Sequence, residues 1–251
     1  MSFKDHFSGH ADAYADARPT YPPALFAQLA ALAPDRALAW DAGCGNGQAA
    51  LELAQHFDAV LATDPSAPQI ANATPHPRVR YAVEPAERCS ARDSSVDLVS
   101  VAQAYHWFDP ARFADEVRRV ARPGAIVAVY GYDVLRVVPA VDAVIDRLYD
   151  DVLGAYWPPE RSLVDAHYAT LPFPWQPLRM PGVAMQHDWT LPQLVAYLGT
   201  WSAAQRCRAA TGVDAIAAAR PALERAWGDP SRARTVRWNL FGRVGRVAPP
   251  A

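Results

Sequence analysis

The stretch Asp41-Ala42-Gly43-Cys44-Gly45-Asn46-Gly47 decides the fold. It follows the short apolar run 38–40 and leads into a helical pattern, so three glycines stand where a strand turns into a helix. Glycine accepts positive φ and has no Cβ, so such a turn lets the backbone approach a ligand while the N–H groups of the next helix face it. The sequence therefore predicts a nucleotide-binding turn at residues 41–47.

The spacing of the glycines narrows the choice of ligand. A dinucleotide-binding turn reads G-x-G-x-x-G, which here would need a glycine at position 48, where the chain has Gln48. Asp64 ends the next predicted strand, 21 residues after Gly43, and its carboxylate is placed to accept hydrogen bonds from both ribose hydroxyls. A surface acid at a strand end is the plainer alternative. The turn and the acid together indicate a ribose without naming the whole ligand.

Strands and helices are predicted to alternate on both sides of this turn. Apolar runs indicate strands at about 38–41, 60–64, 79–83, 96–102 and 125–130. Helices are expected at 22–32, at 47–56, and from Asp109 as N-cap to a turn at Arg122-Pro123-Gly124. This alternation predicts an α/β fold with a mostly parallel sheet, helices on both faces and a ligand at the carboxyl ends of the strands.

The alternation fades after Tyr132, which predicts a second region. Residues 133–233 are rich in proline and aromatic residues, and six of the eight tryptophans follow residue 150. We expect a largely helical lid whose aromatic rings either pack in the core or form a wall over the site. The run 234–247 alternates apolar with polar residues. The predicted organisation is a ligand-binding core with an N-terminal flap (1–132), a lid (133–233) and a closing strand that returns to the core sheet (234–251).

Composition limits the kinds of partner. The chain has 251 residues, 51% of them hydrophobic, enough for a full core. Its formal net charge of −2 and its unclustered basic residues argue against nucleic-acid binding. The three cysteines lack C-x-x-C spacing, which argues against a metal site and indicates a reducing, cytoplasmic compartment. No stretch reaches the ~20 apolar residues of a membrane span, so a soluble protein is expected, while the oligomeric state stays open.

Four stretches give the chain a family resemblance. They are Tyr14–Pro22 (YADARPTYP), Asp41–Gly47 (DAGCGNG), Ala102–Asp109 (AQAYHWFD) and Arg119–Gly124 (RVARPG). In this order they make the region from about Phe3 to Tyr130 resemble the class I S-adenosylmethionine (SAM) methyltransferases, and within them the type-11 group that includes trans-aconitate methyltransferase-like proteins. The resemblance implies a Rossmann-like seven-stranded sheet with an antiparallel strand near the C-terminus, SAM as cofactor with S-adenosylhomocysteine as product, and a small-molecule substrate.

The resemblance also assigns residues to the cofactor. The Gly-rich turn would hold the methionine portion, Asp64 the ribose, and Pro65 with the stretch 85–87 the adenine. Arg18 in the N-terminal flap could pair with the SAM carboxylate, although an arginine in a loop is also commonly only solvated. The full implied set is Tyr14, Arg18, Asp41, Ala42, Gly43, Gly45, Gly47, Asp64, Pro65, Ala86, Glu87, Gln103 and Ala104.

Tyr105 and His106 are the candidate catalytic residues, because they follow the predicted strand 96–102 at the expected methyl end of the cofactor. His106 has three roles open to it: a general base, an orienting donor or pocket wall, or a structural residue. The sulfonium is already an activated donor, so positioning and exclusion of water are the enzyme's main contribution. A base is needed for a hydroxyl or amine acceptor and not for a carboxylate.

The part of the site that would bind the methyl acceptor has no motif of its own, so other functions stay open. Arg136, Arg161 or Arg179 could bind the carboxylate of an acceptor. Methylation of a carboxylate oxygen therefore ranks slightly above methylation of other O, N or C atoms. A SAM-binding module without its own turnover is an alternative, because the lid carries no assignable signature. A nicotinamide-dependent oxidoreductase is a weaker one, because Gln48 stands where its third glycine is required.

Overall fold

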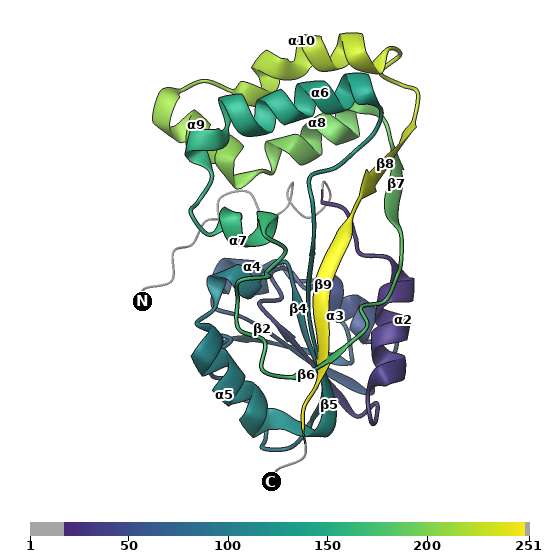
Figure 1. Ribbon diagram of the computed structural model, residues 1–251, viewed down its shortest axis with the longest axis vertical. Coiled ribbons are helices and arrows are strands. Elements are labelled where there is room, and N and C mark those ends of the chain that lie inside the picture. Colours follow the sequence, from purple (N-terminus) through teal and green to yellow (C-terminus); the bar gives the residue numbers. More distant parts are fainter. Residues whose placement is uncertain (1–17, 249–251) are drawn as a thin grey trace.

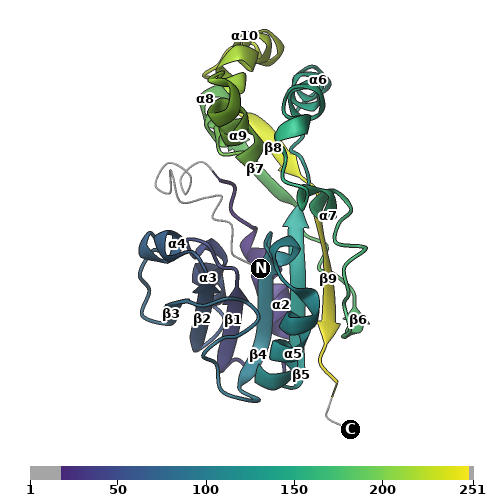
Figure 2. The same ribbon diagram turned by 90° about the vertical axis from the view of Figure 1, so that its left-hand side faces the viewer.

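The computed structural model describes residues 18–248, so Tyr14 lies outside the described residues. It has two parts, an α/β core and a mainly helical lid, and the lid lies beyond one edge of the core sheet (Figure 1). The arrow of β5 (Ala121–Tyr132) points toward the lid in Figure 2. Because β1 to β5 run parallel, their carboxyl ends all face the lid.

The core sheet has seven strands in the order β3-β2-β1-β4-β5-β9-β6. Their bounds are β1 (Leu38–Ala42), β2 (Ala59–Asp64), β3 (Val79–Val83), β4 (Val96–Ala102), β5, β6 (Gln176–Leu178) and β9 (Leu240–Arg246). β9 runs antiparallel to β5, and β6 runs antiparallel to β9. The predicted Rossmann-like sheet, mostly parallel with an antiparallel strand near the C-terminus, is confirmed.

Helices cover both faces of the sheet because its strands bury side chains on both sides. Along β5, Ile126 and Ala128 belong to the cluster that includes α2 (Pro23–Leu32) and α3 (Gln48–Leu53). Val127 and Val129 belong to the opposite cluster, with α5 (Pro110–Val120). The short α4 (Ala67–Ala71) packs against β2 and β3.

The predicted start of α5 is confirmed, but its predicted end is wrong. The Asp109 carboxylate accepts hydrogen bonds from the N–H groups of Ala111 and Arg112, so it caps the helix. The helix ends at Val120, yet residues 122–124 belong to the first, bulged part of β5 and not to a turn. Gly124, at φ +83°, donates its N–H to the carbonyl of Val247, so pairing with the C-terminal strand draws these residues into the sheet.

The lid contains four longer helices, a short one and a two-stranded sheet. They are α6 (Pro139–Arg147), α7 (Arg161–Asp165), β7 (Met185–Trp189), α8 (Leu191–Gly199), α9 (Ser202–Thr211), α10 (Ala215–Trp227) and β8 (Arg234–Trp238). A π-helical turn at Leu148–Val152 and a 3-10 turn at Gly154–Tyr156 follow α6. α10 packs across α6 and α8, and α7 lies between this layer and the sheet (Figure 1).

The single closing strand expected at 234–247 is two strands. The chain divides at Asn239: β8 pairs with β7 in the lid, and β9 pairs with β5 in the core. Trp238 anchors the lid side, where its ring contacts Trp189 and Tyr197. The lid segment also returns to the core once, as β6. Core and lid are therefore interleaved along the sequence.

Arg119, from the RVARPG stretch, has a structural role. Its guanidinium pairs with Glu116 at 2.6 Å and Asp93 at 2.6 Å, and it donates to the carbonyls of Cys89 and Ala91. Glu116 is 8% exposed, also accepts the N–H of Cys89, and has its pKa lowered chiefly by the hydrogen bond from Arg119. Arg119 thus joins α5 to the loop between β3 and β4.

We predict that Arg119→Ala lowers the free energy of unfolding by about 1–3 kcal/mol, because it removes the ion-pair partner of Glu116, which keeps only the Cys89 N–H, and the donor to two carbonyls. Folding lowers the pKa of Glu116. Its contribution to the free energy of unfolding is therefore complete above the pKa of the unfolded state and is lost as the pH falls through the pKa of the folded state. Urea unfolding at pH 7 and below pH 4 measures both effects. The control is Arg118→Ala, whose exposed pair with Asp115 should contribute under about 1 kcal/mol. Equal losses in the two variants would contradict the assignment.

Neither a membrane-spanning helix nor a metal-binding cluster is found among the described residues. Across residues 18–248 no helix is both long and apolar enough to cross a membrane. Over the same range no group of three or more His, Cys, Asp or Glu side chains is arranged to hold a metal ion.

Candidate active site

The Gly-rich turn lies between β1 and α3 and is bonded to the end of β2. The N–H groups of Gly43 and Cys44 donate to the carbonyl of Thr63 at 2.8 and 3.0 Å. The N–H of Gly45 donates to the Asp64 carboxylate at 2.9 Å. All three glycines of the turn have positive φ, from +55° to +88°. The turn is thus held by β2 in a conformation that other L-residues rarely adopt.

The space around two of these glycines differs. A Cβ at Gly43 would lie 2.6 Å from the Cβ of Ala104, so the end of β4 packs directly on the turn. A Cβ at Gly45 would meet only Gln69 Oε1, at 3.9 Å, and would otherwise project into open space. The turn is therefore closed toward β4 and open at Gly45, as a cradle for a ligand requires.

Asp64 stands where the sequence predicted an acid beside the turn. One carboxylate oxygen accepts the N–H of Gly45 and the other the N–H of Ser66, at 2.8 Å. These two bonds fix the orientation of a half-buried carboxylate beside the turn. Pro65, the next residue, is also half-buried.

Asp41 is fully buried at the end of β1, and neither of its carboxylate oxygens has a hydrogen bond of good geometry. Burial, and then the charge of Asp64, raise the pKa of Asp41 to about 7, and the nearby N–H of Ala50 offsets this only in part. A buried carboxylate without a donor is costly. The ammonium group of an amino acid would supply both donors and opposite charge here.

The end of β4 forms the other wall of the site. The sheet order reverses between β1 and β4, which is where open α/β sheets bind their ligands. Gln103 has φ +53°, and its side-chain oxygen accepts the N–H of Tyr132 at 2.9 Å, so it ties β4 to the end of β5. Such strain in a non-glycine residue is typical of binding sites. Ala104 follows, buried against Gly43.

Tyr105 and His106 differ in their surroundings. The Tyr105 hydroxyl donates to the carbonyl of Pro172, and burial raises its pKa to about 12. His106 is half-buried and its Nδ1 lies 3.1 Å from the Tyr168 hydroxyl. Burial, and then the charge of Arg161, lower the pKa of His106 to about 3. At neutral pH Tyr105 is protonated and His106 is neutral.

The stretch after β3 lies at the same edge of the sheet. Ala86 is buried, and the Glu87 carboxylate accepts the N–H of Asp109 at 2.8 Å. This bond joins the predicted adenine-binding loop to the start of α5. Glu87 therefore has a partner within the core, besides the role that the sequence resemblance implies.

Arg18 connects the core and the lid. Its guanidinium donates to Thr200, at the end of α8, through both Oγ1 and the backbone carbonyl, and to the Tyr132 hydroxyl at 3.4 Å. Two residues on, the carbonyl of Thr20 lies 3.1 Å from His187 Nε2 in β7. The structure thus places Arg18 between the end of β5 and the lid.

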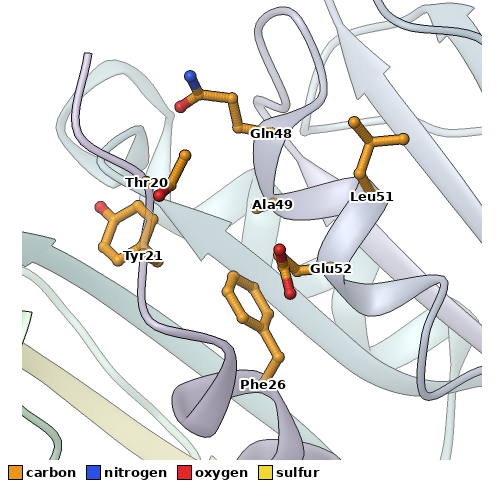
Figure 3. A pocket seen from close by; sticks show the side chains of 7 residues that line it. All are labelled: Thr20, Tyr21, Phe26, Gln48, Ala49, Leu51 and Glu52. Atoms are coloured by element: carbon orange, nitrogen blue, oxygen red, sulfur yellow. The ribbon is translucent and has the colours of Figure 1, made fainter.

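A small cavity of about 130 Å³ lies beside the turn. In Figure 3 Thr20 and Tyr21 stand on one side of it and Gln48 and Ala49, at the start of α3, on the other. Phe26, Leu51 and Glu52 complete the lining. The volume is well below the ~300 Å³ of a typical ligand pocket, and none of residues 41–47 lines the cavity, so it is not itself the ligand site.

Arg161 lies among aromatic rings of the lid and near His106, which follows β4. Arg161 in α7 is 19% exposed and lies over the rings of Tyr149 and Trp157, with ring centroids at 5.3 and 5.0 Å. Its charge acts on His106 and Tyr168. The other two arginines that the sequence proposed differ: Arg136 pairs with Asp146 at the surface, and Arg179 is exposed.

Comparison with known proteins places this site in a family. A sequence model described as a methyltransferase domain matches residues 40–129, which include the turn, Asp64 and the end of β4. A Dictyostelium discoideum protein assigned as a methyltransferase is 30% identical over 204 residues, 80% of this chain and 78% of its own length. The chain belongs to the class I SAM-dependent methyltransferases. It is therefore an enzyme whose methyl donor is SAM, as the resemblance implied.

Two further similarities agree with this membership. An uncharacterized methyltransferase of Mycobacterium bovis is 39% identical over 120 residues, 47% of this chain and 48% of its own length. A solved structure from Anaeromyxobacter dehalogenans, assigned as a type II methyltransferase, is 50% identical, with a TM-score of 0.87, and the match covers 93% of this chain and 99% of that one. That match includes the lid as well as the core.

The described residues fit SAM at the turn. The unpartnered Asp41 carboxylate suits its ammonium group, the open side of Gly45 its methionine chain, and Asp64 its ribose. Sequence reasoning did not find Tyr168 or Thr200, which lie in the lid and meet His106 and Arg18 only through folding. No motif surrounds either residue, so no sequence signal pointed to them.

We predict that Asp41→Asn stabilises the protein without SAM at pH 8 by roughly 2–4 kcal/mol. Folding raises the pKa of the Asp41 carboxyl group from near 4 to about 7. The contribution of this group to the free energy of unfolding is therefore highest below pH 4 and falls as the pH rises to about 7. Asparagine does not titrate, so that loss disappears. Thermal or urea unfolding from pH 4 to pH 8 measures it, and an unchanged pH dependence would contradict the burial argument. The same variant should bind SAM more weakly, because the ammonium loses its counter-charge.

We also predict that Gly43→Ala weakens SAM binding at least roughly 30-fold, because the new methyl group must displace Ala104 and deform the turn. Isothermal titration calorimetry measures the affinity. Gly212→Ala is the matched control: Gly212 has a similar φ of +74° but open space around its Cβ position, so it carries the backbone cost without the clash. Equal SAM affinity in both variants would overturn this account.

Proposed function

We propose that this enzyme transfers the methyl group of SAM to a carboxylate oxygen of a small organic acid held between the core sheet and the lid. The observation that carries the proposal is the state of Arg161. Its Nε is occupied, by the Tyr149 hydroxyl at 2.7 Å and by Asp165 at 3.0 Å. Among residues 18–248 no hydrogen bond is made by its two terminal nitrogens. A half-buried guanidinium with a free pair of N–H donors is suited to a bidentate carboxylate.

The position of Arg161 supports an acceptor at this point. Its charge lowers the pKa of His106, so it lies near the end of β4, where the family resemblance places the methyl group. The rings of Tyr149 and Trp157 hold the guanidinium by cation–π contacts. An acid bound by Arg161 would therefore have its carboxylate close to the cofactor and its carbon chain among aromatic side chains.

The protonation states favour an acceptor that needs no base. Neither candidate suits a general base at pH 7: His106, with a pKa of about 3, is neutral but only weakly basic, and Tyr105, with a pKa of about 12, keeps its proton. Bound SAM would supply an activated methyl group on a sulfonium. A carboxylate oxygen forms the new O–CH₃ bond while the S–CH₃ bond breaks and its electron pair stays on sulfur, so no proton moves. The products are a methyl ester and S-adenosylhomocysteine.

The residues of the site then act by positioning. Asp41 and Asp64 hold the two ends of the cofactor, and Arg161 holds the acceptor. Arg18, by joining Thr200 to Tyr132, keeps the lid over the carboxyl ends of the strands and limits the access of water. Tyr105 keeps the loop at Pro172 in place. We assign no metal and no nucleic-acid partner to the reaction.

The test is incubation with methyl-labelled SAM and a panel of mono-, di- and tricarboxylic acids, phenols and amines. We expect label in one or more acids, in a product that alkali hydrolyses to labelled methanol. Alkali-stable label in a phenol or an amine would overturn the carboxylate assignment while leaving methyl transfer intact.

We predict that Arg161→Met raises the KM for the acid about 10- to 100-fold, which is what losing a charge-assisted bidentate contact costs, and leaves the Kd of SAM within about twofold. Arg136→Met removes a surface arginine of the same lid and should change neither constant. Steady-state kinetics with the acid found above measure KM, and calorimetry measures the Kd of SAM. An unchanged KM in Arg161→Met would contradict its role.

A further inference from the structure

Tyr168 belongs to the lid sequence but is buried in the core. It follows α7 by three residues, is 0% exposed, and packs edge-on against Tyr105 and Phe241, with ring centroids 5.8 and 5.4 Å apart. Both neighbours lie on the core side, one after β4 and one in β9. The lid therefore inserts one phenol ring beside the end of β4.

The backbone is strained at Tyr168 and at the residue before it. His167 and Tyr168 have φ of +53° and +58°, two consecutive non-glycine residues in the left-handed region. His167 is held there by Asp133, at 2.7 Å from its Nε2, and by stacking on Phe241 at 4.5 Å. Strain that the surroundings maintain in this way indicates that the direction of the Tyr168 side chain matters.

The Tyr168 hydroxyl has a single hydrogen-bond partner among residues 18–248, the Nδ1 of His106 at 3.1 Å. The two rings are nearly parallel, at 20°, with centroids 5.9 Å apart. If Nδ1 carried the proton and donated, the phenolic O–H would be a fully buried donor without an acceptor, which is costly. If the phenol donates to Nδ1, both groups are satisfied, and the imidazole proton must be on Nε2.

We propose that Tyr168 is a positioning residue that fixes His106 as its Nε2–H tautomer, so that His106 offers the acceptor a neutral N–H donor. Among the described residues Nε2 has no hydrogen-bond partner, and the ring is half-buried. This role rests on the proposed placement of the acceptor near the end of β4, but not on the identity of the acceptor. A donor at this place can bond a polar atom of the acceptor, and the arrangement removes the base role for His106 because Nδ1 already accepts the Tyr168 proton.

The charges around His106 agree with a neutral ring. Arg161 from α7 is the charged group that acts on it, and Tyr168 is the titratable group bonded to it. A cation nearby and burial both oppose a second ring proton. The pKa of Tyr168 is itself raised well above its usual range by burial, so the phenol keeps the proton that it donates.

The tautomer can be measured directly on the whole protein with S-adenosylhomocysteine added. In protein labelled with ¹⁵N-histidine, long-range ¹H–¹⁵N correlation spectra distinguish protonated from unprotonated ring nitrogens, and His106→Gln assigns the signal. We expect Nδ1 unprotonated and Nε2 protonated from pH 5.5 to 8. In Tyr168→Phe, which keeps the ring packing, we expect the preference for Nε2–H to fall roughly five- to tenfold, the shift that one hydrogen bond supplies. Tyr156→Phe, another lid tyrosine, should leave the spectrum unchanged.

Each other outcome overturns the proposal. A proton on Nδ1 in the unaltered protein, or a charged imidazolium at pH 7, excludes the neutral Nε2–H donor. An unchanged Nε2–H preference in a folded Tyr168→Phe shows that something else sets the tautomer. The spectrum of the unaltered protein stands even if Tyr168→Phe fails to fold. Because no acceptor is used, the result is independent of whether the substrate is a carboxylic acid.

Discussion

The bonds between the Gly-rich turn and the end of β2 are the constraint on which the rest of the site depends. Thr63 accepts two N–H groups of the turn through one carbonyl, and the Asp64 carboxylate accepts a third. They hold a backbone that has positive φ at three positions and that brings Gly43 against Ala104. With the turn fixed in this way, β1, β2 and β4 present their polar ends to one common space. Asp41 is fully buried in that space, and its burial raises the pKa of its carboxyl group to about 7.

Much of the core could be predicted from the sequence because its signals are local. The strands at 79–83 and 96–102 are found as predicted, and Asp109 caps α5, because apolar runs and capping residues act over a few positions. The Arg122-Pro123-Gly124 prediction was wrong for the opposite reason. Gly124 pairs with Val247, more than a hundred residues away, and this pairing turns an apparent turn into a bulged strand. The division of the last strand at Asn239 depends in the same way on distant partners, Asp133 and the aromatic rings of the lid.

The geometry of the Gly-rich turn could be predicted from the sequence, whereas the surroundings of the lid residues could not. The glycines and Asp64 act through the backbone and at fixed spacing, so their pattern is visible in the chain. Arg161 could be named only as one of three arginines, because its half-burial and its aromatic neighbours come from the packing of the lid. The link between Tyr168 and His106 joins residues 62 positions apart and leaves no pattern at all. Side chains that meet through lid packing follow no period, so only the folded structure assigns them roles.

The junction at Asp133 and Asn239 has a consequence for how the molecule opens. The chain leaves the core just after β5, returns once to form β6, and enters the core again just before β9. The first and last of these connections are bonded together: Asp133 and Asn239 bond to each other twice, and Arg136 and Arg237 exchange both backbone hydrogen bonds. Because the two segments are bonded to each other, a movement of the helical layer relative to the sheet would have to bend both connections together.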